Sequence, residues 1–551
     1  MTDQLEDTHF DVIVLGTGLT ESIVAGALSR AGKKVLHLDS NMQYGSSWSV
    51  YALKPLLDWK EKVTNTDNVK DTVPAFTIAF DGNCKNSFQH VALTLGVNEA
   101  SAGQDDGPLT EQEESLLSQV TEADRERYIS PWQSTVDKDD GAYLGKLASL
   151  VTCLKASRQY SLDTCPKLLA ARGQLVEDLI RSGVGRYLDF KSVDDMFVFD
   201  HGDHALKKVP GSKEDVFTNK SISLVDKRKL MKFLTFAMSD EKEEALLQDI
   251  DSQSYADYLE AKFKITGKLQ SAVVHGISLS TSNVTAKEGL ERTQAFLRSM
   301  GRFGRGSYLC AMYGGGSEIA QAFCRTCAVF GGIYILGQSL KSFLVDQESG
   351  VCRGVVTADG QEFTAGAIIT GFDYLPSEWQ PLESEVSWVS KAILVSAEPL
   401  SQFTQAGSDQ AIGISVIPPK DDQDDLVVVQ NQSSETSACP PGQYVTYFST
   451  RSNIDVLKIA VQTMLSSTDQ DHREDDPFLF HLVYQQCARS RQTVKDRVPG
   501  NLYVCSDPDA SLDFEAALAE AKSIFTDCIQ DDQVEFMPAP PDMDVDDIPT
   551  D

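Results

Sequence analysis

FDVIVLGTGLTE, at residues 10–21, decides the fold of this chain. Its run of β-branched and aliphatic residues predicts a buried strand that ends in a glycine turn. We expect a helix from about Thr20 to Ala31, and then a second strand over 34–39 that ends on the carboxylate of Asp39. This order, with an acid about 20 residues after the glycines, is typical of the first βαβ unit of a dinucleotide-binding domain. The sequence therefore predicts an α/β, Rossmann-like large domain.

The glycine motif is incomplete, because Glu21 stands where G-x-G-x-x-G has its third glycine. In a working site the glycines let the backbone approach a pyrophosphate, and the positive end of the helix dipole faces the phosphates. The Glu21 carboxylate would repel an anion there, although an acid in the first turn suits the helix itself. We therefore interpret Gly16, Gly18, Glu21 and Asp39 as a vestigial dinucleotide motif, and we expect a degenerate FAD site with no bound cofactor.

The chain has 551 residues and carries 49 Lys and Arg against 81 Asp and Glu, a formal net charge of −32. This charge disfavours nucleic acid and anionic membrane surfaces, and it favours basic or neutral protein partners. No apolar run approaches the ~18 residues of a membrane span, and the first residues lack the pattern of a secretory signal. The 11 scattered cysteines indicate reduced thiols. We expect a cytosolic (cytoplasmic) protein.

Composition and periodicity divide the chain into parts. We expect residues 1–212 to form the first part of the large domain, with an acidic, partly disordered insertion at about 98–157. Residues 213–301 have helical periodicity throughout, which predicts a separate all-helical domain inserted into the large one. Residues 302–530 return to the α/β pattern and form the second part of the large domain. The acidic, proline-rich residues 531–551 are expected to be a disordered tail.

Local signals place the remaining elements. Thr164-Cys165-Pro166 predicts a helix start with proline in the first turn, and Ser182-Gly183 predicts its end. Residues 111–127, inside the insertion, could form a solvated helix. A helix is expected over 318–328, after a glycine-rich turn. Strands are expected at 197–200, 206–209, 333–336, 342–345, 351–357, 368–369, 391–395, 412–417, 426–429 and 501–505.

Cys324 and Cys327 spell C-x-x-C, which alone could mean redox chemistry or half of a zinc site. No second pair with zinc spacing exists, and the motif lies inside a predicted helix. We interpret both as structural thiols. The sequence offers no convincing nucleophile, general base or metal-ligand set, so we expect neither a metal site nor catalysis.

Several longer segments are more specific than the glycine motif, and together they resemble the superfamily of Rab GDP dissociation inhibitors and Rab escort proteins. The start of the chain and the segment around the predicted helix end at Gly183 resemble the superfamily as a whole. Three later segments resemble the escort branch, and one of them is similar to its Rab-binding segment. The matching residues are 12–21 with 32–37, 173–190, 229–236, 323–334 and 501–505.

The resemblance implies a flavoprotein-type (FAD-binding) fold that works without flavin, with an inserted helical domain. It implies that the large domain binds Rab GTPases in their GDP state and that the helical domain handles prenyl groups. Escort proteins present newly made Rab to the Rab geranylgeranyltransferase heterodimer and deliver the lipidated product to membranes. The expected partners are therefore GDP-bound Rab, the transferase, the geranylgeranyl lipid and, transiently, a membrane. The chain would be a non-catalytic accessory component.

The resemblance also implies a set of Rab-binding residues: Tyr44, Glu318, Arg325, Ile333 and Ile335. Glu318 and Arg325 lie about two helical turns apart on one face, where an acid and a base can grip a polar surface. Without the resemblance, a solvated helix face would be the simpler interpretation. The glycine-rich turn before Glu318 is one residue longer than the family pattern, which puts the pose of Glu318 in doubt.

The helical domain is expected to contact the transferase and the lipid. Phe296 and Arg302, at the end of its last predicted helix, are the transferase candidates, although Phe296 could equally be core. The lipid candidates are Phe233, Leu234, Phe236 and Met238, some of which must simply pack the domain.

Two alternatives stay open. A flavin oxidoreductase of the same fold would bind flavin in spite of Glu21. A GDP dissociation inhibitor would recycle Rab without engaging the transferase.

Overall fold

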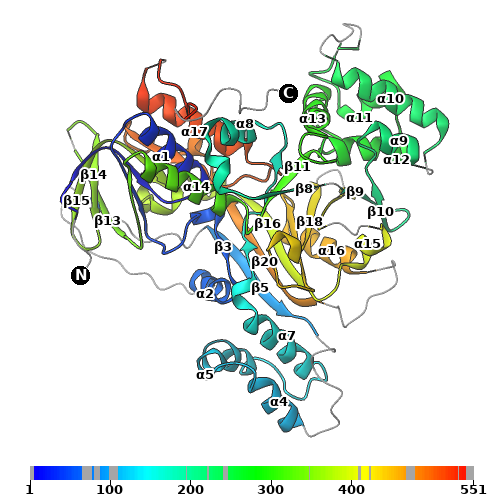
Figure 1. The fold of residues 1–551 in the computed structure, drawn as a ribbon, viewed down its shortest axis with the longest axis horizontal. Helices are drawn as coiled ribbons and strands as arrows, with labels where there is room; N and C mark the ends of the chain where they lie inside the picture. Colours follow the sequence, from blue (N-terminus) through cyan, green and yellow to red (C-terminus); the bar gives the residue numbers. More distant parts are fainter. Residues whose placement is uncertain are drawn as a thin grey trace.

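In the computed structural model, the chain forms two large sheets and a separate helical lobe (Figure 1). The structure describes residues 5–64, 77–79, 87–97, 109–193, 195–219, 222–239, 246–247, 249–346, 348–407, 411–420, 424–466, 478–531 and 533–540. Among the helices of these residues, none has the length and apolar character of a membrane span.

The opening βαβ unit forms as predicted. Strand β1 (His9–Leu15) leads through the glycine turn into helix α1 (Leu19–Arg30), and β2 (Val35–Asp39) follows. The side chains of β1 alternate between the faces of the sheet, as its pleat requires. Val12 and Val14 pack in the core cluster that contains α1, and Ile13 and Leu15 pack on the opposite face. Both faces of the strand are therefore covered, which explains its continuous apolar sequence.

The first sheet has a parallel half around β1 and an antiparallel half beyond it. β15 pairs in parallel with β1 and with β21, and β12 pairs in parallel with β2 at the other edge. The strand order is β12 (Ile333–Leu336), β2, β1, β15 (Glu362–Gly371), β14 (Cys352–Thr357), β13 (Leu340–Val345) and β4 (Thr77–Ala79), with β21 (Leu502–Cys505) beside β15.

Two further helices join α1 on one face of this sheet: α14 (Gly316–Val329) and α17 (Glu515–Ile529). The fully buried ring of Phe323 lies between α14 and α1, and helix α8 (Gln174–Ser182) packs beside α17. Each helix contributes an apolar face to one continuous core, so burial rather than helix propensity holds them in place.

The second sheet is mostly antiparallel and lies on the other side of the molecule (Figure 1). Helices α15 (Ser401–Gln405) and α16 (Ile454–Leu465) cover one face, and α7 (Tyr143–Lys155) covers the other. The strand order is β10 (Ala205–Lys208), β9 (Asp195–Asp200), β17 (Ile412–Ile417), β18 (Val427–Ser433), β19 (Tyr444–Thr450), β16 (Ser387–Ser396), β20 (Phe478–Ala488) and β5 (Phe88–Leu95). The strands predicted for this half of the chain are present.

The acidic insertion contains more order than we expected. Residues 98–108 lie outside the described part, but α4 (Leu109–Leu117) and α7 are formed, and short helical turns occupy 122–133 between them. Leu147 and Leu154 of α7 are buried in the core cluster of the second sheet. The ordered residues 143–155 differ from the partly disordered segment that we expected, because α7 itself carries no acid and its apolar side chains pack into this core.

The inserted helical domain begins and ends near the predicted bounds and forms a lobe of its own (Figure 1). Four of its helices or helical turns start at a Ser or Thr whose hydroxyl accepts the backbone N–H three residues on, which stabilises each helix start by about 1 kcal/mol. Its helices are α9 (Lys213–Thr218), α10 (Leu224–Met238), α11 (Tyr255–Tyr258), α12 (Gly267–Ser271) and α13 (Ala286–Ser299).

Two other predictions were wrong. Thr164-Cys165-Pro166 does not start a helix: Thr164 donates through its N–H and hydroxyl to the Ser49 carbonyl, and Cys165 N–H donates to the Asp163 carboxylate. The distant Ser49 and the neighbouring Asp163 together hold an irregular segment, and the helix begins only at Gln174. The described part of the predicted tail, 533–540, is packed against the large domain, and Met537 is fully buried there.

Candidate functional site

Helix α14 and the loop of Tyr44 come together at the edge of the first sheet. Ser317 Oγ, in the first turn of α14, donates to the Tyr44 carbonyl over 3.1 Å. The ring of Tyr44 lies 6.0 Å from the ring of Tyr334 in strand β12, a distance within the range of aromatic pairs. Two segments about 270 residues apart in sequence are thereby fixed to each other next to Glu318.

Arg325 projects from the exposed face of α14. Its guanidinium lies 4.2 Å from the centroid of the Tyr187 ring, and Tyr187 itself is 45% exposed. Within the described part of the chain, no carboxylate forms an ion pair with Arg325. Stacking on an aromatic ring holds the guanidinium plane while its N–H donors stay available, so Arg325 can bind an external carboxylate or carbonyl.

Glu318 lies about two turns before Arg325 on the same helix, about 10 Å along the axis. The carboxylate is half-buried, and this burial raises its pKa above the usual 4.5. A partly desolvated acid without a basic partner among the described residues suits a hydrogen-bond donor from another protein.

Strand β12 differs from the prediction in which side chains it exposes. Ile333 and Ile335 are only partly exposed and pack against the core of the first sheet, whereas Tyr334 between them faces outward. Successive side chains of a strand point to opposite faces of the sheet, which produces this arrangement in an edge strand. Tyr334 is thus the most exposed apolar side chain of this strand, and a role of Ile333 and Ile335 in Rab binding stays a prediction.

The exposed surface around Arg325 contains apolar residues that sequence reasoning missed. Val329 is 64% exposed at the end of α14, and Phe330 follows it at 40%. In the sequence, the feature that could have indicated them is the apolar end of α14, because the other face of this helix already supplies enough apolar residues for the core. We call this surface the platform and define it by Tyr44, Tyr187, Glu318, Arg325, Val329 and Tyr334.

The vestigial dinucleotide motif lies behind the platform, at the start of α1. The Glu21 carboxylate is buried against the glycine backbone, and a Cβ added at Gly371 would lie 2.7 Å from one of its oxygens. Burial raises the pKa of Glu21 well above its usual 4.5, and the nearby acids Glu520, Asp373 and Asp507 raise it further. The side chain thus occupies the space through which a pyrophosphate would approach the backbone.

Asp39, the acid that would hold a ribose hydroxyl, already has protein partners on both oxygens. Thr17 donates to one oxygen through its N–H over 2.8 Å and through its hydroxyl over 2.6 Å. Tyr374 Oη and Asn41 N–H donate to the other oxygen over 3.0 and 2.7 Å. The carboxylate is fully buried, so these donors replace the ones that a cofactor would supply.

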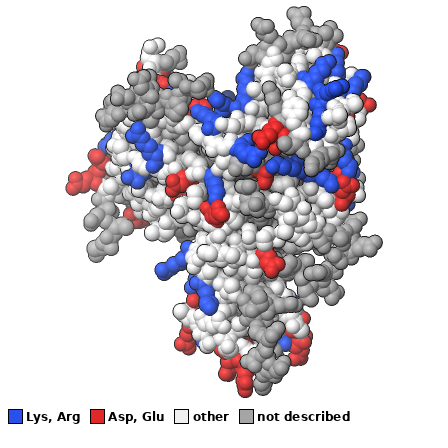
Figure 2. Space-filling view, turned by 45° about the vertical axis from the view of Figure 1, so that its right-hand side comes forward, with Lys and Arg blue, Asp and Glu red and all other residues white. Residues whose placement is uncertain are grey.

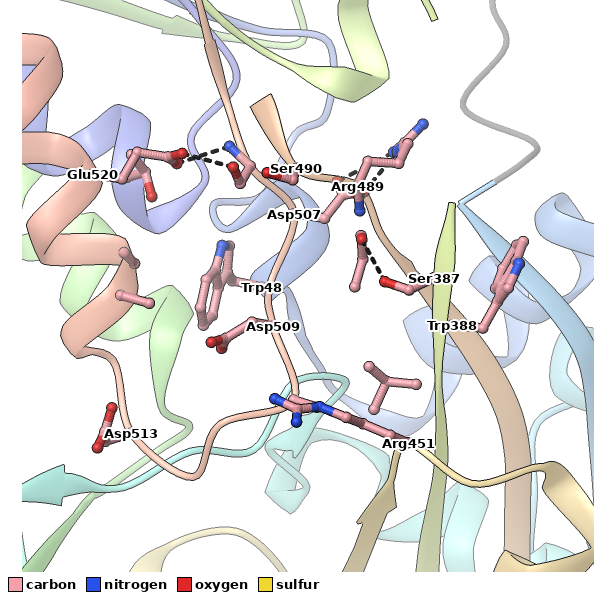
Figure 3. A pocket seen from close by; sticks show the side chains of 17 residues that line it. Trp48, Ser387, Trp388, Arg451, Arg489, Ser490, Asp507, Asp509, Asp513 and Glu520 are labelled. Atoms are coloured by element: carbon pink, nitrogen blue, oxygen red, sulfur yellow. Dashed lines mark hydrogen bonds and ion pairs between the residues drawn. The ribbon is translucent and has the colours of Figure 1, made fainter. Parts of the chain in front are cut away.

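A cavity of about 630 Å³ lies between α17 and the second sheet, close to Thr20 (Figure 3). Its wall carries four carboxylates, Asp507, Asp509, Asp513 and Glu520, and two guanidinium groups, Arg451 and Arg489. Arg489 is already bound to Asp507, with Nε 2.6 Å from Oδ2. A wall with this balance of charge disfavours phosphate groups. With Glu21 and Asp39 engaged as described, the residues present do not fit a flavin dinucleotide.

Comparison with known proteins matches the profile of the GDP dissociation inhibitor family to residues 6–90 and 146–537. The chain belongs to the GDP dissociation inhibitor family. The gap between the matched ranges, residues 91–145, covers most of β5 and the acidic insertion up to the start of α7.

Among relatives of this family member, the mouse protein named Rab proteins geranylgeranyltransferase component A 2 is 30% identical over 97% of each chain. The human component A 1 is 30% identical over 98% of this chain and 93% of its own. The Arabidopsis thaliana Rab escort protein 1 is 25% identical over 95% of this chain and 92% of its own. A crystal structure of Rab GDI from Plasmodium falciparum superposes with a TM-score of 0.63 at 19% identity, covering 95% of this chain and 99% of that one, which establishes the shared fold.

The residues predicted to contact a transferase are buried in this GDP dissociation inhibitor family member. Phe296 is 5% exposed and its ring packs 6.2 Å from Tyr308. Arg302 forms an ion pair with Glu177 and donates to the Ala171 carbonyl over 2.8 Å. Both side chains join the helical domain to the large domain, and contact with another protein would require them to leave these partners. That they contact the transferase stays a prediction.

The four lipid candidates divide between the core and the surface. Phe233 is fully buried, with its ring 5.1 Å from Phe263, and Leu234 is 6% exposed. Both belong to the core of the helical domain. In this structure, neither side chain is accessible to a lipid, although we predicted lipid contact for both. Phe236 is half-buried, and Met238 is 41% exposed at the end of α10.

The exposed apolar residues of the helical domain cluster instead around the start of α10. Phe217 is 66% exposed, Leu224 76% and Val225 61%. Lys227 Nζ donates to the Phe217 carbonyl over 2.8 Å, which ties α9 to α10, and Arg228 lies exposed next to it. Figure 2 shows basic side chains gathered over this lobe. We call Phe217, Leu224, Val225 and Arg228 the helical surface.

Cys324 and Cys327 are buried on the inner face of α14. Cys324 Sγ lies 3.4 Å from Ser22 Oγ, and Cys327 Sγ lies 3.0 Å from Ser29 Oγ. Burial raises the pKa of the Cys324 thiol to about 12 and that of Cys327 to about 11, so both stay protonated at neutral pH. Within the described residues, no three His, Cys, Asp or Glu side chains are grouped to hold a metal ion.

Proposed function

We propose that this chain is a Rab escort protein. It binds Rab in the GDP state, presents it to Rab geranylgeranyltransferase and delivers the prenylated product to membranes. The observation that carries the proposal is the 30% identity, over nearly the whole chain, with proteins named as component A of that transferase. The platform supports it, because it combines an oriented base and a half-buried acid on α14 with aromatic rings from strand β12, the loop of Tyr44 and the turn of Tyr187.

The platform suits a polar switch surface of a GTPase better than a small ligand. Arg325 and Glu318 offer one donor group and one acceptor group about 10 Å apart, which two side chains of a protein partner can reach together. Tyr334 and Val329 add exposed apolar area to the platform. Aromatic and Arg anchors within such a patch dominate the affinity of protein interfaces.

The helical domain suits the lipid part of the task. A geranylgeranyl chain of about 20 carbons is costly to expose to water, at roughly 0.8 kcal/mol per CH₂. Phe233 and Phe263 fill the centre of the helical domain with aromatic rings. A prenyl chain would enter by displacing such side chains, so the lipid-bound domain would differ from the present one. The resulting complex is cytosolic and contacts a membrane only on delivery.

We propose that no flavin takes part and that the chain is an accessory component without catalysis of its own. Glu21 and Asp39 support this, because their carboxylates are already engaged where a dinucleotide would bind. The purified chain is expected to show no flavin absorption band and to release no flavin on denaturation. A yellow protein with one flavin per chain would favour the oxidoreductase alternative instead.

We propose that the helical surface contacts the transferase. Phe217→Ala is expected to weaken binding of the chain to purified transferase by about tenfold, because an exposed aromatic anchor next to an Arg is a common hot spot. Phe296→Ala is the matched control. It removes a buried ring and is expected to lower the free energy of unfolding by about 3–5 kcal/mol without that specific loss. Equal transferase affinity of Phe217→Ala and the parent chain would remove this assignment.

Binding to a Rab GTPase loaded with GDP tests the main proposal. The chain is expected to retain GDP-loaded Rab and to release most of it when GTP replaces GDP. Addition of purified transferase distinguishes the two family functions. An escort protein forms a complex of all three proteins, whereas a recycling GDP dissociation inhibitor does not. Failure to retain GDP-loaded Rab would remove the proposal.

A further inference from the structure

The last described segment, residues 533–540, lies across the helices that support the platform. We call it the strap. Phe536 packs edge-on against Phe525 of α17 at 5.3 Å between ring centroids, and Lys522 Nζ lies 5.4 Å from the centroid of the same Phe536 ring. The strap is therefore bound to α17 by apolar and cation–π contacts rather than loosely apposed.

Arg181, at the end of α8, anchors the strap by two polar contacts. Its Nη1 lies 2.6 Å from Glu535 Oε1, and its Nη2 donates to the Phe536 carbonyl over 3.0 Å. The same Nη2 donates to Asp178 within α8 over 3.0 Å. One guanidinium thus fixes the strap backbone to α8, and a charge-assisted bond to a carbonyl is stronger than an ordinary one.

Met537 connects the strap to α1 and α14. It is fully buried, and its Cε lies 3.2 Å from the position that a Cβ at Gly26 would take. The Phe323 carbonyl lies 3.1 Å from that same position. Glycine within a helix costs about 1 kcal/mol relative to alanine, and here it leaves room for the close approach of α14 and Met537. Met537 therefore packs directly behind the helix that carries Arg325.

Pro540 packs near Gly183, the residue that precedes the turn of Tyr187. Its Cγ lies 3.3 Å from the position of a Cβ at Gly183, the left-handed residue (φ 74°) that ends α8. The turn Val184–Tyr187 starts from Gly183, and Tyr187 is the ring on which Arg325 stacks. The strap thus touches both the helix that carries the guanidinium and the turn that carries its stacking partner.

We propose that the strap is a positioning element of the platform, and that Met537 and Pro540 set the geometry of the Arg325–Tyr187 pair. The strap contributes no group to the partner. It acts through α14 and through the turn at Gly183, and its loss lets the guanidinium leave the ring. This proposal rests on the proposed function, because it assumes that the platform binds GDP-loaded Rab.

The test is a double-mutant cycle in the full chain, with the affinity for GDP-loaded Rab and the thermal unfolding midpoint as readouts. Met537→Ala is expected to weaken Rab binding about tenfold, an effect within the range of coupling through packed side chains. Met464→Ala is the matched control, because it removes an equally buried methionine from α16 beneath the second sheet. It is expected to lower the unfolding midpoint as much as Met537→Ala and to change Rab affinity less than about twofold.

The second arm repeats Met537→Ala in a Tyr187→Ala background, where it should cause no further loss of affinity. Pro540→Gly, at a partly exposed position, is expected to fold normally and to weaken binding in the same direction. Equal affinities of Met537→Ala and Met464→Ala, or a full tenfold loss that persists without Tyr187, would overturn the proposal. A parent chain that does not bind Rab would instead overturn the proposed function.

Discussion

Arg325→Ala is expected to weaken binding of GDP-loaded Rab by about 30-fold or more, roughly 2 kcal/mol, with no change in thermal stability. The guanidinium is exposed and oriented by Tyr187, so its removal costs the folded chain little while the complex loses charge-assisted hydrogen bonds. Titration of the variant against GDP-loaded Rab by calorimetry measures the change. Arg325→Lys is expected to recover only part of the affinity, because an ammonium neither stacks nor binds in a fork.

The matched control is Arg353→Ala. Arg353 is 68% exposed in its side chain, lies in β14 and pairs with Asp346 at the far, antiparallel side of the same sheet. Its removal is expected to leave Rab affinity within about twofold of the parent. If both variants bound Rab as the parent does, the platform would not be the binding surface.

Arg489→Met is expected to lower the free energy of unfolding by about 3–5 kcal/mol. The Arg489 side chain is 4% exposed and lies between two carboxylates, with Nε 2.6 Å from Asp507 and Nη2 3.2 Å from Asp373. Figure 3 shows Arg489 beside Asp507. It also donates to Ser87 Oγ over 2.8 Å and to Gln380 over 3.2 Å. Methionine leaves those acids buried without their cation, and urea unfolding of the variant would show the loss.

Lys458→Met provides the comparison for that experiment. Lys458 and Asp455 form an ion pair three residues apart on the exposed face of α16, and such pairs contribute about 0.5 kcal/mol or less. Burial raises the pKa of Asp373 even beside Arg489, so this carboxyl takes up a proton more readily than an exposed one when the cation is removed. The double variant Arg489→Met with Asp507→Leu should therefore recover part of the lost stability. A loss below about 1 kcal/mol for Arg489→Met would contradict the role assigned to this network.

The large-scale fold could be predicted because local signals and tertiary contacts agree. The apolar run of β1, the glycine turn and the acid at Asp39 all indicate one βαβ unit, and the structure forms it. Thr164-Cys165-Pro166 shows the opposite case. Its helix signal is local, but the carbonyl of Ser49, 115 residues away from Thr164, accepts hydrogen bonds from Thr164. The Asp163 carboxylate accepts from Cys165 N–H, and both contacts hold a different conformation.

The site could be predicted only in part. Spacing along a helix placed Glu318 and Arg325 on one face, and the resemblance supplied their role. Which face of β12 is exposed depends on its position at the edge of the sheet, which the sequence does not encode locally, so Ile335 was chosen over Tyr334. Tyr187 stacks on Arg325 from a turn about 140 residues away in sequence, and no local pattern links the two.

Apolar residues in amphipathic helices were the other source of error. Phe296 and Phe217 are both phenylalanines near a helix end, and only the packing of the helical domain against Tyr308 decides that the first is buried. The prediction that the acidic tail is disordered failed at residues 533–540 for a related reason. The composition of the tail is typical of disorder, but Phe536 and Met537 within it are large enough to hold the strap in an apolar groove.

The most direct test of the central claim is a reconstituted prenylation reaction that contains GDP-loaded Rab, Rab geranylgeranyltransferase and geranylgeranyl diphosphate. With this chain added, Rab is expected to receive geranylgeranyl groups, and the product is expected to stay soluble in a complex with the chain. With the Arg325→Ala variant at the same concentration, the initial rate is expected to fall about tenfold or more. Equal prenylation with and without the chain would contradict the account.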